Sequence, residues 1–541
     1  MKRNIYTIGV LMLAVFFTLS SCLNDLDTRP IWEEENDAEN VFSNELGEYT
    51  SFIAKIYAGL AISGNKGGDD QADVEGVDGG SQASFLRGLW NLQELPSDLA
   101  HCVWVDVGIE DFNYMTWAIG NPFIKGFYYR LFYQIGVANE FLRETTEGKL
   151  SDRGVSDADQ AIIKEYRAEA RFLRALAYYH LLDMFRNVPF ITEESAVGAI
   201  KPPQTNGVDL FNYIEEELLE CSEDMLDPFV GYNATHYGRA HKAAAWTLLS
   251  RLYLNAEVYT GQERYTDCIT YSKKVLGVSG YALEENYKNL FVADNDQSKE
   301  IIFPIRYEGN QTQTWGGMTF LICSTVPPAM KDEIYAKDAW NGNRAKYGLV
   351  KLFNKEANAS NDTRSKMLHP EHAENEQIID PSKFTDGVPV VKFVNLKKDG
   401  TPVTEANREV YTDFPYFRLG EVYLNLAEAV LKNGQGATKQ EALAKVNELR
   451  ARAYDKNTGY QITEKDLTLD FILDERAREF FFEAHRRTDL IRHNKLTTGT
   501  YLWDWKGGVA GGKAVDDKFN IYPLPADDTG VNTGLEQNPG Y

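Results

Sequence analysis

The stretch that decides the fold is LTLDFILDERAREFFFEAHRRTDLIRHNK, residues 467–495. Its apolar side chains recur close to helical spacing. They are Phe471, Ile472, Phe480, Phe482, Leu490 and Ile491. Three consecutive phenylalanines, 480–482, predict a helix that is buried on more than one stripe.

The same stretch is dense in charges of both signs. Glu475, Glu479 and Glu483 follow one another at single helical turns. Among them stand Arg476, Arg486, Asp489 and Arg492. Buried charge is costly unless it is paired, so we expect a structural ion-pair network. The alternative is that Glu475 and Glu479 form a catalytic acid/base pair, but the sequence implies no pocket around them.

Three motifs along the chain carry a family resemblance. ERxxEFxxExxRxxDLIR (475–492), EARFLRALAYYHLLDMFRNVPFI (169–191) and the closing QNPGY (537–541) resemble signatures of the SusD/RagB family. A PLP at 523–525 replaces the usual PIP of the closing motif. This family consists of glycan-binding lipoproteins of the Bacteroidetes outer membrane, and the resemblance spans nearly the whole chain.

The composition and net charge of the chain limit the classes of molecule that it can bind. The chain has 541 residues, 43% of them hydrophobic, and a formal net charge of -24. An acidic protein of this kind is repelled by nucleic acid and anionic lipid, but not by a neutral polymer. Length alone suggests roughly three domains, whereas the family resemblance implies a single SusD-like domain over 41–541.

The N-terminus reads as a lipoprotein signal. Lys2 and Arg3 precede an apolar run, Ile8 to Phe17, that is too short to span a bilayer. The next residues, 19–22, read LSSC and resemble a bacterial lipobox, which predicts a signal peptide over 1–21 and acylation of Cys22. The alternative is an ordinary secretory signal with a stray cysteine. Residues 23–40 are acidic and predict a tether, and the family resemblance implies an outer-membrane protein that faces the cell exterior.

Helical patterns dominate the remainder. The clearest helix is expected at 157–185, and others at 46–62, 121–145, 208–226, 240–259, 264–276, 421–432 and 439–453. About four helix pairs of this kind resemble tetratricopeptide repeats. Irregular insertions are expected at about 64–118 and 279–410, the latter with strand-like runs at 300–307 and 388–394. The resemblance implies that these insertions form the ligand face.

The cysteines other than Cys22 predict neither a zinc site nor a redox motif. Cys102, Cys221, Cys268 and Cys323 are scattered, without metal-ligand spacing. We expect buried free thiols, and a disulfide pair among them stays open.

Three tryptophans in the irregular segments predict a sugar site. Trp104, Trp315 and Trp340 offer flat faces on which the C–H faces of sugar rings stack. In the starch-binding founder of the family, three aromatics cup the curved helix of an α-1,4-glucan, and the motif match implies that role for these positions. The alternative for each is a core position, which we favour for Trp90 and Trp246.

Polar candidates accompany the aromatics. Arg87 and Asp78 match polar contacts of the founder upstream of its first aromatic, while Asn343 and Arg344 are either ligands or turn anchors. The asparagine that follows the first aromatic in the founder has no clean match, because residues 105–107 read VDV. Asp294 and Asp296 give weak calcium candidates, for which a solvated turn is the favoured interpretation.

The resemblance implies a binding protein that delivers α-glucan oligosaccharides to a SusC-like TonB-dependent transporter, without cofactor or bond cleavage. One rival is a family member that binds another glycan or peptides. The other is an all-α glycoside hydrolase, which needs two carboxylates about 5 to 10 Å apart. Asp69, Asp70, Asp73 and Asp78 are the acidic residues on offer, but a glycine-rich loop holds catalytic groups badly.

Overall fold

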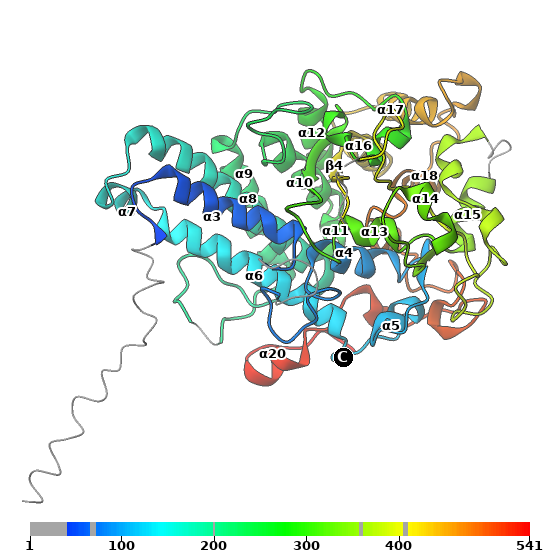
Figure 1. The fold of residues 1–541 in the computed structure, drawn as a ribbon, viewed down its shortest axis with the longest axis horizontal. Helices are drawn as coiled ribbons and strands as arrows, with labels where there is room; N and C mark the ends of the chain where they lie inside the picture. The colour runs from blue at the N-terminus through cyan, green and yellow to red at the C-terminus, as the bar shows by residue number, and fades with distance from the viewer. Residues whose placement is uncertain (1–40, 65–71, 199–200, 356–360, 404–408) are drawn as a thin grey trace, which may run out of the picture.

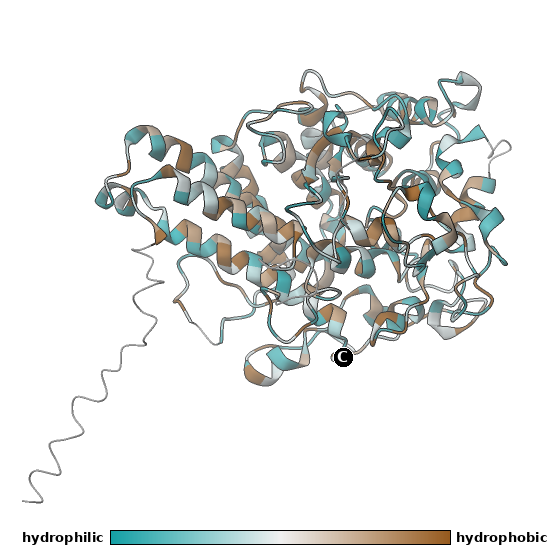
Figure 2. Ribbon diagram, viewed as in Figure 1, coloured by the Kyte–Doolittle hydropathy of each residue, from teal (hydrophilic) through white to brown (hydrophobic). Residues whose placement is uncertain are grey.

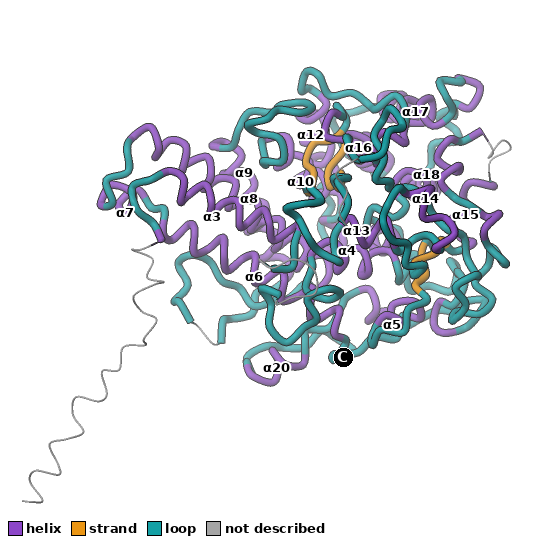
Figure 3. Tube along the Cα trace, in the orientation of Figure 1, coloured by secondary structure: helices purple, strands orange, loops and turns teal. Residues whose placement is uncertain are grey.

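The computed structural model describes residues 41–64, 72–198, 201–355, 361–403 and 409–541. Helices predominate among them, and long loops gather in the half of the molecule that holds α13, α14 and α15 (Figure 3). The predicted signal peptide, Cys22 and tether lie outside the described residues, as do Asp69 and Asp70.

Eight of the predicted helical segments form helices that pack against one another in chain order (Figure 1). They are α3 (Leu46–Ala61), α6 (Pro122–Glu144), α8 (Asp157–Phe185), α9 (Gly207–Asp224), α10 (Lys242–Leu254), α12 (Tyr265–Leu276), α16 (Leu419–Leu431) and α17 (Lys439–Ala453). Each contacts the next, which confirms the mostly α, tetratricopeptide-like class.

Helix α8 illustrates why these segments fold locally. The Ser156 hydroxyl accepts the backbone N–H of Asp159 at 3.2 Å and caps its first turn. Arg186, with φ 64°, ends it in a conformation that no helix can continue. Because α8 lies between α6 and α9, its second half is buried on almost every side. Apolar residues, brown in Figure 2, alternate with polar ones along these helices.

The helix predicted over 240–259 is not continuous, which corrects that expectation. It breaks at Asn255 into α10 and α11 (Ala256–Thr260). The Asn255 side chain donates to the carbonyl of Arg251 at 2.9 Å and accepts from the Arg492 guanidinium at 3.0 Å. A tertiary contact with a residue 237 positions away therefore stabilises the break, and no local pattern could reveal it.

Two short antiparallel strand pairs join distant segments. β1 (Ala100–Cys102) pairs with β3 (Asn343–Ala345), and β2 (Ile301–Ile305) pairs with β4 (Phe414–Arg418). β2 confirms the strand predicted at 300–307. The run 388–394 forms isolated bridges instead, from Val388 to Ala345 and from Val390 to Leu368. The strand prediction there was wrong because successive residues face different partner segments, so no ladder forms.

The insertions carry short helices between their loops. Within 64–118 these are α4 (Phe85–Glu94) and α5 (Ile109–Tyr114). Within 279–410 they are α13 (Met318–Cys323), α14 (Lys331–Ile334) and α15 (Tyr347–Asn354). Beyond them lie α7 (Glu147–Asp152) after α6 and α20 (Ala526–Val531) near the C-terminus.

The stretch 467–495 is two helices, not one. α18 (Leu469–Phe480) ends inside the phenylalanine run, and α19 (Arg486–Arg492) begins after a turn in which Phe482 and Ala484 have positive φ. One carboxylate oxygen of Glu94 accepts the backbone N–H groups of Ala484 and His485 at 2.8 and 3.3 Å. The buried Glu94 carboxyl therefore accepts hydrogen bonds from two backbone N–H groups that would be paired within the helix if α18 continued.

The predicted ion-pair network is confirmed, but most of the cations that contact Glu475, Glu479 and Glu483 come from outside the stretch 467–495. Arg364 bonds to Glu475 at 2.8 Å and to Glu479 at 2.9 Å, and all three side chains are fully buried. Arg418 reaches Glu300, Glu479 and Glu483. Further partners are Lys392, Arg450, Arg452 and Arg478. Burial opposes ionisation of Glu475 and Glu479, but the surrounding arginines outweigh it and lower the pKa of both carboxyls.

In the part of the chain that the structure describes, Cys102, Cys221, Cys268 and Cys323 are buried and free, as predicted. Burial raises the pKa of each thiol, so these cysteines behave as small apolar residues. None of the helices within the described ranges combines the length and the hydropathy that crossing a membrane requires.

Candidate functional site

Trp104, Trp315 and Trp340, which we call the tryptophan arc, come from distant segments and meet on the loop-rich side of the molecule. The ring centroids of Trp104 and Trp340 are 6.5 Å apart, and those of Trp315 and Trp340 are 5.8 Å apart. Successive rings are turned by 45° and 68°. All three side chains are half-buried and keep part of their surface in solvent, and Trp104 and Trp340 pack on the core.

The β1–β3 pair and the turn before β3 position two of the rings. The backbone N–H of Val103 donates to Gly342 at 3.0 Å, which holds the end of β1 against that turn. Trp340 donates its own backbone N–H to Cys323 at 2.6 Å. A Cβ on Gly342 would stand 2.1 Å from the Trp104 indole, so only glycine lets the ring approach this closely.

Arg87 supports the arc from beneath. Its guanidinium lies 5.3 Å from the ring centroid of Trp104 and 4.7 Å from that of Phe320, which itself packs against Trp104. Its backbone N–H donates to Gly316, next to Trp315. Arg87 is almost fully buried, and this burial lowers the pKa of its guanidinium. The arginine thus fixes two rings at once through cation–π and backbone contacts.

Asp78 lies at the exposed edge of the same region. Its carboxylate accepts the backbone N–H of Ser81 at 2.7 Å and the Ser81 hydroxyl at 2.6 Å. The turn that Asp78 organises presents the Gly80 carbonyl to Arg87 at 3.4 Å. The turn therefore connects Asp78 to Arg87, and the Arg87 guanidinium in turn contacts the Trp104 ring.

Asn343 and Arg344 are both buried in β3. The Asn343 amide donates to the Ser324 hydroxyl at 2.8 Å. The Arg344 guanidinium donates to the side chain of Asn341 and to the carbonyl of Phe384. These contacts give both residues an anchoring role beneath the arc. Burial lowers the pKa of Arg344 to about 10.

The weak calcium candidates do not converge. The Asp294 carboxylate accepts the backbone N–H of Lys398 at 2.8 Å, and Asp296 accepts from Gln297 at 3.3 Å. Asn295, between them, is buried and ties two carbonyls together. Over the described ranges, no three His, Cys, Asp or Glu side chains gather as metal ligands would.

The other candidates separate into core and surface. Trp90 is fully buried, as expected, whereas Trp246 is only half-buried, with the Lys274 ammonium 5.6 Å from its ring. Asp73 pairs with Lys55 at 3.0 Å and with Arg130 at 3.5 Å. Its carboxylate is therefore held by structural ion pairs.

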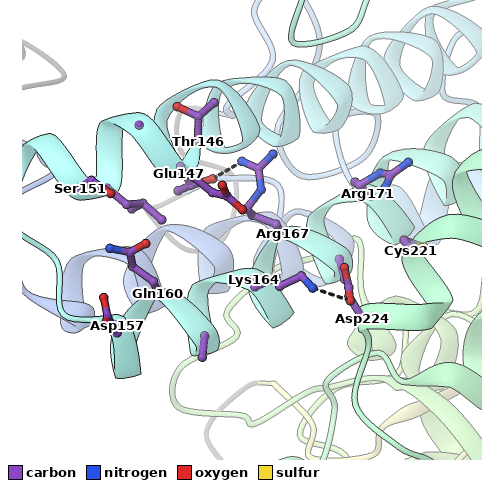
Figure 4. A pocket seen from close by; sticks show the side chains of 15 residues that line it. Thr146, Glu147, Ser151, Asp157, Gln160, Lys164, Arg167, Arg171, Cys221 and Asp224 are labelled. Carbon is purple, nitrogen blue, oxygen red and sulfur yellow. Dashed lines mark hydrogen bonds and ion pairs between the residues drawn. The ribbon is translucent and has the colours of Figure 1, made fainter.

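A hollow of about 820 Å³ lies at the far end of the helical stack, among α7, α8 and α9 (Figure 4). Its lining includes Lys164 and Asp224, which pair at 2.9 Å, and Arg167, which donates to Thr145. The residues that line it carry no aromatic ring on which a sugar could stack. The hollow therefore lacks the chemistry that the tryptophan arc provides.

Sequence reasoning missed the glycines and the phenylalanine that shape the arc. Gly316 and Gly342 permit close approach, and Phe320 forms the floor under Trp104. The signals were present as WGG at 315–317 and WNG at 340–342. A tryptophan beside a glycine indicates a ring held against backbone.

Comparisons with known proteins define the class first. A family model described as the SusD family matches residues 299–541. Solved structures share the fold. A surface glycan-binding protein A from Bacteroides fluxus superposes with a TM-score of 0.70 at 19% identity, over 92% of this chain and 100% of that one. A laminarin-binding SusD-like protein superposes with a TM-score of 0.69 at 23% identity, with the same shares covered.

Two individual relatives then show to which family the chain belongs. The starch-binding protein SusD of Bacteroides thetaiotaomicron is 36% identical, over 97% of this chain and 96% of the relative. A SusD-like protein of Formosa agariphila is 23% identical, over 87% of this chain and 92% of the relative. The chain therefore belongs to the SusD family, as its motifs predicted.

Proposed function

We propose that this protein binds an α-1,4-glucan on the tryptophan arc. The observation that carries the proposal is the convergence of three half-buried rings whose planes turn by 45° and 68° in succession. A curved glucan presents its sugar faces in turning directions, whereas a flat chain needs coplanar rings. The starch-binding relative, 36% identical, supports the same ligand class.

The activity is binding, without bond cleavage. Glu475 and Glu479 are fully buried inside the ion-pair network, where a glycan cannot contact them, and Asp73 is held by two cations. Incubation of the purified protein with amylose should release no reducing ends above background. Steady release that one carboxylate substitution abolishes would favour the hydrolase instead.

We also propose the cellular setting. Residues 41–541 form one SusD-like domain, tethered by residues 23–40 to an acylated Cys22 in the outer membrane, facing the exterior. There the protein delivers bound oligosaccharides to a SusC-like TonB-dependent transporter. The family membership and the lipobox-like sequence support this setting. Co-purification of such a transporter from native membranes tests it.

Calorimetry with maltoheptaose tests the ligand assignment. Each stacked ring contributes about 1 kcal/mol, so Trp104→Ala, Trp315→Ala and Trp340→Ala should each weaken binding about five- to tenfold. The triple variant should lose binding. Trp246→Ala, a half-buried tryptophan on the helical side, is the matched control and should bind as the parent does.

Two outcomes would contradict the proposal. If circular dichroism shows that the triple variant is folded and it still binds maltoheptaose like the parent, the glucan site lies elsewhere. A parent that ignores maltoheptaose but binds cellohexaose or a peptide would overturn the α-glucan assignment and favour the rival family members.

A further inference from the structure

A second pair of aromatic rings lies outside the tryptophan arc. Tyr114, the last residue of α5, and Trp505 have ring centroids 5.9 Å apart, with planes 44° apart. Both side chains are half-buried. α5 packs against the 3-10 turn η8 (Lys506–Gly508) that follows Trp505, and Figure 1 places the C-terminal segment beside α5.

Trp505 is held in a conformation that its side chain disfavours. Its backbone has φ 67° and ψ 7°, the left-handed region that bulky residues rarely occupy. Glycine would adopt this conformation without strain, and glycines already stand at 507 and 508. The indole N–H donates to the carbonyl of Ile378 at 2.7 Å and fixes the ring. Backbone strain of this kind concentrates at functional sites.

Polar groups border the two rings. The Tyr114 hydroxyl is buried enough to raise its pKa, and its hydrogen bond to Glu110 adds to the effect. The Gln377 amide donates to one carboxylate oxygen of Asp504 at 3.4 Å. The other oxygen of Asp504 is buried and has no hydrogen-bond partner. Asp504 directly precedes Trp505, so a carboxylate stands next to this ring in the chain.

One loop connects this pair to the arc. At one end, Arg344 beneath the arc donates to the carbonyl of Phe384, a residue that is 43% exposed. At the other end, Ile378 holds Trp505. A Cβ on Gly387 would stand 2.5 Å from Ile378 and 2.9 Å from Arg344, so these two side chains pack on the same glycine. The segment from Ile378 to Phe384 spans at most ~20 Å when fully extended.

We propose that Tyr114 and Trp505 form a second contact site for the same α-glucan, which a long chain reaches after it leaves the tryptophan arc. The inference rests on the proposed function, because it takes the same ligand. A short oligosaccharide occupies the arc alone. A long chain contacts both sites, and the second contact adds affinity by making its binding intramolecular.

The test compares a short and a long glucan on one variant. Trp505→Gly removes the ring while its backbone conformation becomes the one that glycine prefers. Calorimetry should show amylose binding about three- to tenfold weaker, as expected for one lost stacking contact, and maltotetraose binding unchanged. Trp505→Phe keeps a stacking face and is the matched control, which should retain most of the amylose affinity.

Hydroxyl-radical footprinting of the unmodified protein avoids any effect of substitution on folding. Oxidation of Trp505 should fall when amylose is bound and stay unchanged with maltotetraose. Unchanged amylose affinity in Trp505→Gly, or unchanged oxidation of Trp505, overturns the second site. If Trp104→Ala still loses maltotetraose binding in that case, the proposed function of the tryptophan arc stands. A parent that binds neither glucan overturns both.

Discussion

Glu94 shows how one buried side chain links the fold to pH. Burial raises the pKa of its carboxyl from 4.5 to about 8, although two backbone N–H groups at the α18–α19 turn donate to it. Its second oxygen is buried without a hydrogen-bond partner. The folded protein therefore holds a proton there over a range in which the unfolded chain has lost it.

That difference predicts a pH dependence. A carboxyl whose folded pKa is raised stabilises fully below the unfolded pKa of 4.5, and its contribution is lost as pH rises towards 8. The contribution of Glu94 to the free energy of unfolding should thus fall between pH 5 and 8, by up to about 1.4 kcal/mol per pH unit. Glu94→Gln keeps an acceptor for the two N–H groups and should flatten the slope. Equal slopes in urea titrations of parent and variant would refute the assignment.

Glu479 lies at the centre of the buried network. It bonds to Arg364, Arg418 and Arg452. Glu479→Gln leaves these cations short of a negative partner, so it should destabilise the protein by about 3 to 5 kcal/mol in chemical denaturation. Lys445→Ala, which removes a partly exposed pair with Glu448, should cost no more than about 1 kcal/mol. Similar losses in the two variants would mean that the network contributes no more than a surface pair.

At the scale of elements, the turn before β3 controls the arc. Gly342→Ala should push the Trp104 indole aside, because the new Cβ would stand 2.1 Å from it. We expect maltoheptaose affinity to fall about fivefold or more, equivalent to the loss of one stacked ring. Gly47→Ala, in α3 with nothing within 4 Å of its Cβ, should bind normally and gain up to about 1 kcal/mol of stability. Unchanged binding in Gly342→Ala would show that the Trp104 ring can move without loss.

The long helices were predictable because their apolar spacing and their caps are local. The breaks were not. Asn255 ends α10 through Arg492, and Glu94 stabilises the turn after Phe480. In both cases the partner is hundreds of residues away, so periodicity extends the helix past its real end. The strand predicted at 388–394 was wrong for a related reason. A strand needs a paired neighbour, and these residues form only single bridges to separate segments.

For the candidate site, the three tryptophans could be predicted from the sequence, whereas the roles of the residues around them could not. Trp104, Trp315 and Trp340 follow from the motif resemblance, and the structure brings them together. Asn343 and Arg344 could not be assigned from sequence, because burial decides between a ligand and an anchor. Trp505 carried no signal at all, since its strained backbone conformation is visible only in three dimensions.

For the whole molecule, the proposed membrane attachment depends on Cys22, which lies outside the described ranges. Cys22→Ala should release the protein from the membrane fraction or leave it unprocessed, because the acyl chains would be its hold on the bilayer. Metabolic labelling with a radioactive fatty acid checks this. The soluble form should still bind maltoheptaose with parental affinity, since the arc is built from residues 87–342. Labelling that persists in the variant would contradict the lipobox interpretation.

The buried network also constrains the order in which the chain can fold. Synthesis proceeds from the N-terminus, so Arg364, Arg418 and Arg452 emerge before Glu475 and Glu479. Until then, Asp362 is the buried carboxylate available to Arg364, and Glu300 is the one shared by Arg418 and Arg452. The network around α16 and α17 is therefore complete only after nearly the entire polypeptide has been made. A chain truncated before α18 would therefore lack the carboxylates that complete this network.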